Sequence, residues 1–159
     1  MHLPADIADF TDREPEIQRL TGAIHQLQQQ NVVPFIVIGG IGGVGKTALI
    51  IHFAHLIKDE YPHAQLFINL RGTELQALDP SKVLASFLRA LGIDGSQIPV
   101  TLDERSALFR TRLSGKRVLI VLDNAANEAQ VRPLLPDSPG CAVLINGRVH
   151  LAGIEGARF

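Results

Sequence analysis

The residues best suited to chemistry in this sequence are the eight from Gly40 to Thr47, which read GIGGVGKT. Four of them are glycine, the residue that loses the most conformational entropy when it is fixed, so this density needs a reason. A backbone with few side chains can wrap a row of phosphates and direct successive amide groups at their oxygens. The stretch therefore predicts a phosphate-binding loop, with Lys46 as its mobile cation.

The same residues match the pattern GxxxxGK(S/T), known as the Walker A motif or P-loop. The motif requires a strand before it and a helix after it, and the apolar runs at 35–38 and 47–57 provide both. A helix beginning near Lys46 adds its positive dipole end, and the Thr47 hydroxyl can ligate Mg²⁺. An ordinary glycine-rich turn is the alternative, and the flanking elements argue against it.

A second candidate residue ends the apolar run RVLIVLD at 117–123. A buried strand that ends in an acid has the Walker B form, and Asp123 would hold the Mg²⁺ through water. A strand followed by Asp is by itself more often a simple turn. Its position downstream of a P-loop, in the same expected sheet, favours the metal role.

The elements that must position these residues alternate along the chain. We expect helices at 13–30, 47–57, 80–91, 103–113 and 127–134, and strands at 35–38, 65–70, 117–122 and 141–145. The strands are uniformly apolar, which is typical of a parallel sheet that is covered on both faces. The sequence thus predicts a three-layer α/β fold, mostly parallel, with ligands bound at the carboxyl ends of the strands.

Composition narrows the class of protein. Hydrophobic residues make up 46% of the chain, and 15 Lys and Arg against 16 Asp and Glu give a net charge of -1. This balance predicts no general attraction to nucleic acid or to a membrane surface. We expect a cytoplasmic protein with no membrane span, and we interpret the single cysteine, Cys141, as a small buried apolar residue.

With both motifs identified, several stretches together resemble one family. They are ADFTDREPEIQRL, GGIGGVGKTAL, LFINLRG, KRVLIVLDNA and QVRPLLPDSPGCAVLI. In these stretches the chain resembles the nucleotide-binding core of the NB-ARC group of signal-transduction P-loop NTPases, the STAND class. It is most similar to bacterial members found in transcriptional regulators and in proteins with tetratricopeptide repeats.

The resemblance implies ATP or ADP as ligand, together with Mg²⁺. It assigns the segment from Phe10 to Arg13 to the adenine, and it makes Lys46, Asp123 and Arg148 the catalytic groups, with Arg148 sensing the γ-phosphate. It places the last strand between the P-loop strand and the Walker B strand. The phosphate-binding residues that it implies are Gly42, Gly43, Val44, Gly45, Lys46, Thr47 and Ala48, and Thr47 and Asp123 are the metal ligands.

The chain departs from the family pattern at several positions. Asp12 replaces a glycine of the opening motif, and Asn146 and Gly147 stand where Thr and Ser are common. Asn124 follows Asp123 where many hydrolysing relatives carry a second acid. Because an amide cannot accept a proton from the attacking water, we expect slow hydrolysis. Glu128 is the nearest alternative base, and we expect it to be a poor one.

Other polar residues have simpler interpretations. His52 and His55 stand three apart on the expected P-loop helix, a spacing that permits a metal site, but no carboxylate or cysteine cluster accompanies them in the sequence. Arg71 could contact phosphate or another subunit, or end a strand in a turn. The basic residues Arg105, Arg110, Arg112, Lys116 and Arg117 are expected to form a solvated helix face.

Three functional classes follow. The leading one is a switch, bound to ADP at rest and to ATP when active, with weak ATPase activity and with sensor and effector domains outside these residues. Self-association could be its output. The alternatives are a catalytic P-loop enzyme such as a small-molecule kinase, and a degenerate scaffold. We expect one domain, truncated at its C-terminus, with an adenine-binding segment and helix at 1–33 and a core at 34–159.

Overall fold

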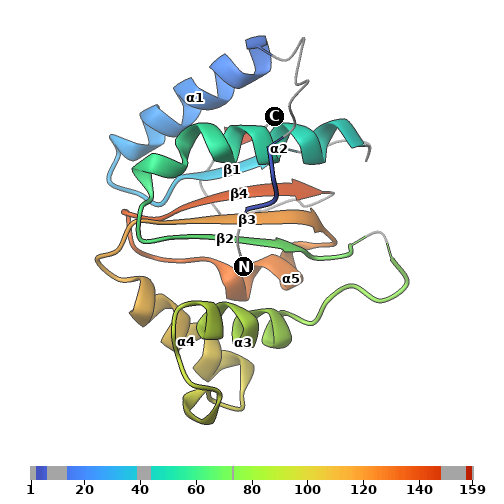
Figure 1. Ribbon diagram of the computed structural model, residues 1–159, viewed down its shortest axis with the longest axis vertical. Helices are drawn as coiled ribbons and strands as arrows, with labels where there is room; N and C mark the ends of the chain where they lie inside the picture. Colours follow the sequence, from blue (N-terminus) through green and yellow to red (C-terminus); the bar gives the residue numbers. More distant parts are fainter. Residues whose placement is uncertain (1–2, 7–13, 39–43, 73, 148–156, 159) are drawn as a thin grey trace.

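A five-stranded parallel sheet forms the middle of the molecule. The computed structural model describes residues 3–6, 14–38, 44–72, 74–147 and 157–158. The strand order is β2-β3-β4-β1-β5, and every neighbouring pair is parallel (Figure 1). The strands are β1 (Phe35–Ile38), β2 (Ala64–Asn69), β3 (Val118–Ala125), β4 (Ala142–Gly147) and β5 (Ala157–Arg158). The four expected strands are confirmed, and β5 is an addition that the sequence did not predict.

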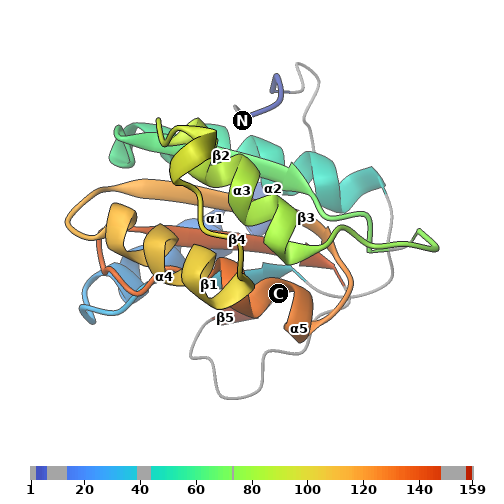
Figure 2. The same ribbon diagram turned by 90° about the horizontal axis from the view of Figure 1, so that it is seen from below.

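Helices cover both faces of this sheet. In Figure 1, α1 (Glu14–Gln28) and α2 (Val44–Ile57) lie on one face, and the remaining helices lie on the other. Figure 2 shows this second face with its helices in front of the strands. They are α3 (Pro80–Ala90), α4 (Leu102–Leu113) and α5 (Glu128–Val131). Short 3₁₀ turns at Lys58–Glu60, Gly95–Gln97 and Arg132–Leu134 follow α2, α3 and α5. The three-layer α/β prediction is confirmed.

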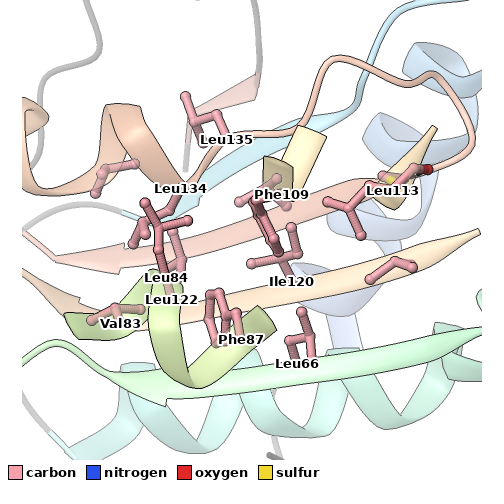
Figure 3. Close-up of a cluster of buried hydrophobic side chains, with 14 of the residues drawn as sticks. Leu66, Val83, Leu84, Phe87, Phe109, Leu113, Ile120, Leu122, Leu134 and Leu135 are labelled. Carbon is pink, nitrogen blue, oxygen red and sulfur yellow. Dashed lines mark hydrogen bonds between the residues drawn. The ribbon is translucent and has the colours of Figure 1, made fainter. Parts of the chain in front are cut away.

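Two apolar clusters hold the layers together. On the α3 and α4 face, the rings of Phe87 and Phe109 stack with centroids 5.7 Å apart, and Ile120 and Leu122 of β3 belong to the same cluster (Figure 3). On the other face, α2 packs against β3 and β4 while α1 packs against β1, and residues of both helices belong to the second cluster. Cys141 is buried and free, as expected.

The helix ends follow local capping rules. The Asp79 carboxylate accepts from the Ser81 amide at the start of α3, and the Thr101 hydroxyl accepts from the Glu104 amide at the start of α4. Gly92 ends α3 with a φ of +93°, where only glycine is unstrained. These boundaries agree with the sequence to within a residue or two.

Strand order decides which residues meet. Because β4 lies between β3 and β1, its last residues stand beside the carboxyl ends of both. Ile38 pairs with Asn146, and Asn69 of β2 pairs with Asp123. The carboxyl edge of the sheet therefore brings the end of the P-loop strand, the Walker B acid and Asn146 to one place. This agrees with the neighbours that the family resemblance implied for the last strand.

Candidate functional site

Thr47 and Asp123 meet at the carboxyl edge of the sheet. Thr47 lies in the first turn of α2, and Asp123 lies near the end of β3. The Thr47 hydroxyl donates to the Asp123 carboxylate, with Oγ1 3.2 Å from Oδ1 and 3.3 Å from Oδ2. Two residues that are 76 positions apart in the chain thus form one polar centre, where the two sequence motifs predicted a metal.

Asn146 completes this centre, and sequence reasoning missed it. Its Nδ2 donates to Oδ1 of Asp123 over 2.6 Å and lies 3.5 Å from the Thr47 hydroxyl oxygen. The sequence pointed to Asn146 only as a departure from the family pattern. Its position at the end of a strand between the P-loop and Walker B strands is the signal that could have identified it.

The Asp123 carboxylate is buried, with the residue only 4% exposed. Burial raises the pKa of Asp123 above its ordinary value, and hydrogen bonds from Asn146, Thr47 and the Asn124 backbone amide lower it again in part. The charged form is therefore costly in the protein alone. A bound cation would remove that cost.

The donor set fits Mg²⁺. A carboxylate and a hydroxyl are hard oxygen ligands, and Mg²⁺ prefers one or two such protein groups together with phosphate oxygens and water. Thr47 and Asp123 would hold the ion, which would neutralise charge on a bound phosphate chain. Among the described residues there is no cluster of three or more His, Cys, Asp or Glu side chains. One carboxylate and one hydroxyl would leave most ligand positions of a Mg²⁺ ion to phosphate oxygens and water.

Two glycines from neighbouring segments of the chain, Gly72 and Gly147, closely approach the backbone just after Asp123. Asn124 has a φ of +56°, and the pairing of β3 with β4 shifts register between Leu122 and Ala125. The Gly72 amide donates to the Asn124 carbonyl over 2.7 Å, and a Cβ at Gly72 would lie 2.5 Å from the Ala126 nitrogen. A Cβ at Gly147 would lie 2.4 Å from the Ala125 carbonyl oxygen. Neither glycine can be replaced without moving the strand end that carries Asp123.

Of the other predicted site residues, some lie in α2 and the rest fall outside the described part of the chain. Helix α2 begins at Val44, three residues before the expected range of 47–57, so Gly45, Lys46 and Ala48 lie in its first turns with Thr47. Five predicted site residues fall outside the described residues, and their roles stay predictions: Phe10, Arg13, Gly42, Gly43 and Arg148.

Glu128, the alternative base, forms an ion pair with Arg132 one turn along the chain. The pair joins two neighbouring residues of the same short helical stretch, α5 and the 3₁₀ turn after it. Whether Glu128 acts as a base stays a prediction.

The two histidines of α2 contact the N-terminal segment. His52 Nδ1 lies 3.0 Å from an oxygen of Asp6, and His55 Nε2 lies 2.6 Å from the carbonyl oxygen of Pro4. The sequence interpretation expected no carboxylate cluster here, and a single carboxylate is present. It could not be found from spacing, because 46 residues separate Asp6 from His52.

The basic run was interpreted as a solvated face, and for Arg105 this is wrong. Its Nε donates to the Pro99 carbonyl over 2.6 Å, and its Nη1 donates to the Ser81 carbonyl over 2.8 Å. Arg105 therefore ties the start of α4 to the start of α3. Arg117 is exposed but also bonded, since its Nε donates to the Glu60 carbonyl over 2.7 Å.

Arg71 forms a turn at the end of β2. Its φ is +56°, its amide donates to the Asn69 side chain over 2.9 Å, and its guanidinium lies 3.9 Å from Glu74. Of the interpretations offered for Arg71, the strand-end turn is the one that these contacts match.

Comparison with known proteins identifies the family to which this chain belongs. The model of the AAA ATPase domain matches residues 9–135, which is most of the chain. The chain belongs to the AAA ATPase domain family. Membership in this family implies nucleotide binding, typically with Mg²⁺.

Two curated relatives are bacterial regulators. The chain is 48% identical over 157 residues to the regulatory protein AfsR of Streptomyces griseus, and 44% identical over 161 residues to AfsR of Streptomyces coelicolor. Both matches cover 99% of this chain and 16% of the relative. This AAA ATPase domain thus spans about a sixth of the length of those proteins.

Solved structures agree with the fold. The Orc1 protein of Aeropyrum pernix, in complex with DNA, matches with a TM-score of 0.63 over 98% of this chain and 46% of its own. Cdc6p of Pyrobaculum aerophilum matches with a TM-score of 0.61 over 99% and 47%. Identities of 16% and 18% limit these likenesses to the fold. No helix in the described part of the chain is long and apolar enough to cross a membrane.

Proposed function

We propose that this AAA ATPase domain is the nucleotide-binding core of an ATP- and ADP-dependent regulatory switch of the NB-ARC type. The observation that carries the proposal is the meeting of the Thr47 hydroxyl with the buried Asp123 carboxylate at the start of α2. This is where a Mg²⁺ bound to phosphates needs its protein ligands. The two regulatory relatives support a regulatory rather than a metabolic role.

Each further role belongs to the same proposal. Gly42 to Ala48 hold the phosphates, Phe10 and Arg13 contact the adenine, and Arg148 responds to the γ-phosphate. The adenine-binding segment and helix take residues 1–33, and the core takes residues 34–159. The two parts act as one domain in the cytoplasm. Its partners are sensor and effector domains of a longer polypeptide, with self-association as an output and with no direct contact to nucleic acid.

Hydrolysis is slow in this proposal because Asn124, rather than a second acid, follows Asp123 in the sequence. Asn124 carries an amide and sits in a left-handed backbone conformation, and Glu128 is paired with Arg132. Catalysis is then limited to charge stabilisation by Lys46, Mg²⁺ and Arg148. A slow hydrolase holds each nucleotide state long enough for other domains to respond to it.

Calorimetric titration tests nucleotide binding. Mg²⁺ with ADP or ATP should bind the protein, and Lys46→Ala should weaken both by at least about tenfold, since it removes the cation that contacts the phosphates. Lys82→Ala is the matched control, because Lys82 is exposed on α3, on the opposite face of the sheet from α2. Flat titrations with both nucleotides would favour the degenerate scaffold.

Incubation with γ-labelled ATP tests the reaction class. The switch predicts release of labelled phosphate over minutes and no transfer to added small-molecule acceptors. Many turnovers per second would contradict a switch with slow hydrolysis. Label on an acceptor would favour the small-molecule kinase.

A further inference from the structure

Asn146, near the end of β4, reaches both residues of the proposed metal centre. Its Nδ2 lies 2.6 Å from Oδ1 of Asp123 and 3.5 Å from Oγ1 of Thr47. The first distance is short for a hydrogen bond between nitrogen and oxygen, and the second is at the upper limit for one. The Asn146 amide is therefore bonded mainly to the Asp123 carboxylate.

The carboxylate decides how the neighbouring polar groups point. An ionised carboxylate only accepts hydrogen bonds, so Asn146 must turn its NH₂ group, and not its carbonyl oxygen, toward Asp123. Thr47 donates its single hydroxyl proton to the same carboxylate, which leaves the lone pairs of the Thr47 oxygen for a cation. Two donors from different elements thus hold Asp123, one from helix α2 and one from strand β4.

The sheet fixes the position of Asn146. It lies opposite Ile38 of β1, and the residues on either side of it pair with β3. The residue is only 6% exposed. A buried side chain on a strand that is paired on both sides has few other positions, so its bond to Asp123 costs little additional conformational entropy.

Asn146 holds one oxygen of the Asp123 carboxylate and thereby places the other. Its Nδ2 donates to Oδ1, whereas Oδ2 accepts from the Thr47 hydroxyl over the longer distance of 3.3 Å. A carboxylate without such a donor rotates over a broad range about its last side-chain bond. With Oδ1 held, a metal ion or its bound water meets the carboxylate in one orientation.

We propose that Asn146 is a positioning residue that orients the Asp123 carboxylate for Mg²⁺ and so tightens binding of the metal to the nucleotide complex. The inference rests on the proposed function and deepens it, because it names a residue that sets metal affinity. A carboxylate that serves a metal needs a hydrogen-bond partner of its own, and loss of such a partner lowers metal affinity by about 10- to 100-fold. The lower end applies here, because Thr47 remains as a second donor.

Calorimetric titration of ADP at a series of free Mg²⁺ concentrations measures this role. ADP affinity should rise with Mg²⁺, and the Mg²⁺ concentration at half of this rise is a midpoint that reports metal affinity. Asn146→Val should raise the midpoint about tenfold, because valine has no donor for Asp123. ADP affinity in EDTA should stay that of the wild-type protein within experimental error. Asn146→Ala, which also lacks a donor, is a second variant and should shift the midpoint in the same direction.

Asn146→Thr is the matched partner of Asn146→Val. Threonine and valine have nearly the same shape and both suit a strand, but only threonine has a hydroxyl proton to donate. The Asn146→Thr variant should therefore need less Mg²⁺ than the Asn146→Val variant. Asn69→Val makes the same change at the exposed end of β2, on the other side of β3, and should keep the wild-type midpoint.

The outcomes separate this inference from the function on which it rests. If the wild-type protein binds no ADP, or binds it equally in Mg²⁺ and in EDTA, the proposed site for metal and nucleotide fails. If wild-type affinity depends on Mg²⁺ and the variants without a donor keep the wild-type midpoint, only the positioning role fails. Equal losses of ADP affinity in Mg²⁺ and in EDTA would also overturn it, as would equal midpoints for Asn146→Thr and Asn146→Val. The change of shape, and not the lost donor, would then be the cause.

Discussion

Burial and metal binding make opposite demands on the Asp123 carboxylate. A Mg²⁺ ligand must be ionised, yet Asp123 is almost fully buried and burial raises its pKa. The hydrogen bonds from Asn146 and Thr47 offset part of this cost and fix the carboxylate in place. Under the proposed function, the ligand-free fold therefore bears the cost of a carboxylate that Mg²⁺ needs in its ionised form.

The Asp123→Asn variant tests whether the buried carboxylate destabilises the ligand-free protein. At pH 7 it should melt at a higher temperature than the wild-type protein in the absence of nucleotide, because it removes a buried charge and keeps the shape. Because the pKa of Asp123 is raised in the folded protein, protonation of this carboxyl group stabilises the folded state. That stabilisation is fully present below the ordinary carboxyl pKa. It is lost as the pH rises through the pKa of the folded protein.

The advantage of Asp123→Asn should therefore shrink when melting is measured at about pH 4, near the ordinary carboxyl value. Thermal melting by circular dichroism at the two pH values measures the effect. A variant that melts below the wild-type protein at pH 7 would show that ionised Asp123 stabilises the empty site.

At the scale of elements, the four-residue helix α5 has a structural role larger than its length suggests. Its Gln130 is only 5% exposed, and the Oε1 atom accepts from the Ala126 amide over 2.7 Å. Its Nε2 donates to the carbonyls of Leu70 and Leu78 over 2.9 and 3.0 Å. One side chain thus closes the base of the loop between β2 and α3 and attaches it to the segment that follows Asp123.

Gln130→Leu should destabilise the protein by about 2–4 kcal/mol, because it removes the partner of the Ala126 amide and of the Leu78 carbonyl, while the Leu70 carbonyl keeps only its bond from the Leu78 amide. Urea unfolding at pH 7 measures the change, with Gln76→Leu in the exposed part of the same loop as the control. The control should stay within about 0.5 kcal/mol of wild type. A similar small effect for Gln130→Leu would mean that water can replace the amide.

These elements also show what the sequence could predict. The strands β1 to β4 and the ends of α3 and α4 depend on apolar runs and caps within a few residues, so they were predicted correctly. Thr47 and Asp123 were found because each belongs to a motif with a known partner. Their metal role is still a prediction.

Asn146, Gln130 and Asp6 were not predicted as structural contacts, and β5 was not predicted at all. Each depends on neighbours that only the folded chain brings together, such as the Asp123 carboxylate 23 residues before Asn146. Arg105 was misinterpreted for the same reason, because its bonds to the Ser81 and Pro99 carbonyls leave no trace in residue spacing.

At the scale of the whole molecule, the proposed site depends on several layers at once. Thr47 comes from the α2 layer, and Asp123 and Asn146 come from the middle of the sheet. Gly72, in the loop after β2, and Gln130 of α5 support the end of β3 through Asn124 and Ala126. A ligand that bridges these layers binds only the folded state. Its binding energy must therefore appear as added stability of the entire domain.

Mg²⁺ with ADP should consequently raise the melting temperature of the wild-type protein. At a free concentration 100 times the dissociation constant, one site adds about 2.7 kcal/mol, which corresponds to roughly 5–10 °C for a chain of this size. Differential scanning calorimetry with and without the ligand measures the shift, and EDTA should reduce it by removing the metal. Asp123→Asn should start from a higher melting temperature and gain little from adding Mg²⁺ to ADP. A variant that gained as much as the wild-type protein would show that Asp123 does not hold the metal, because the stabilising energy would then come from contacts that this carboxylate does not make.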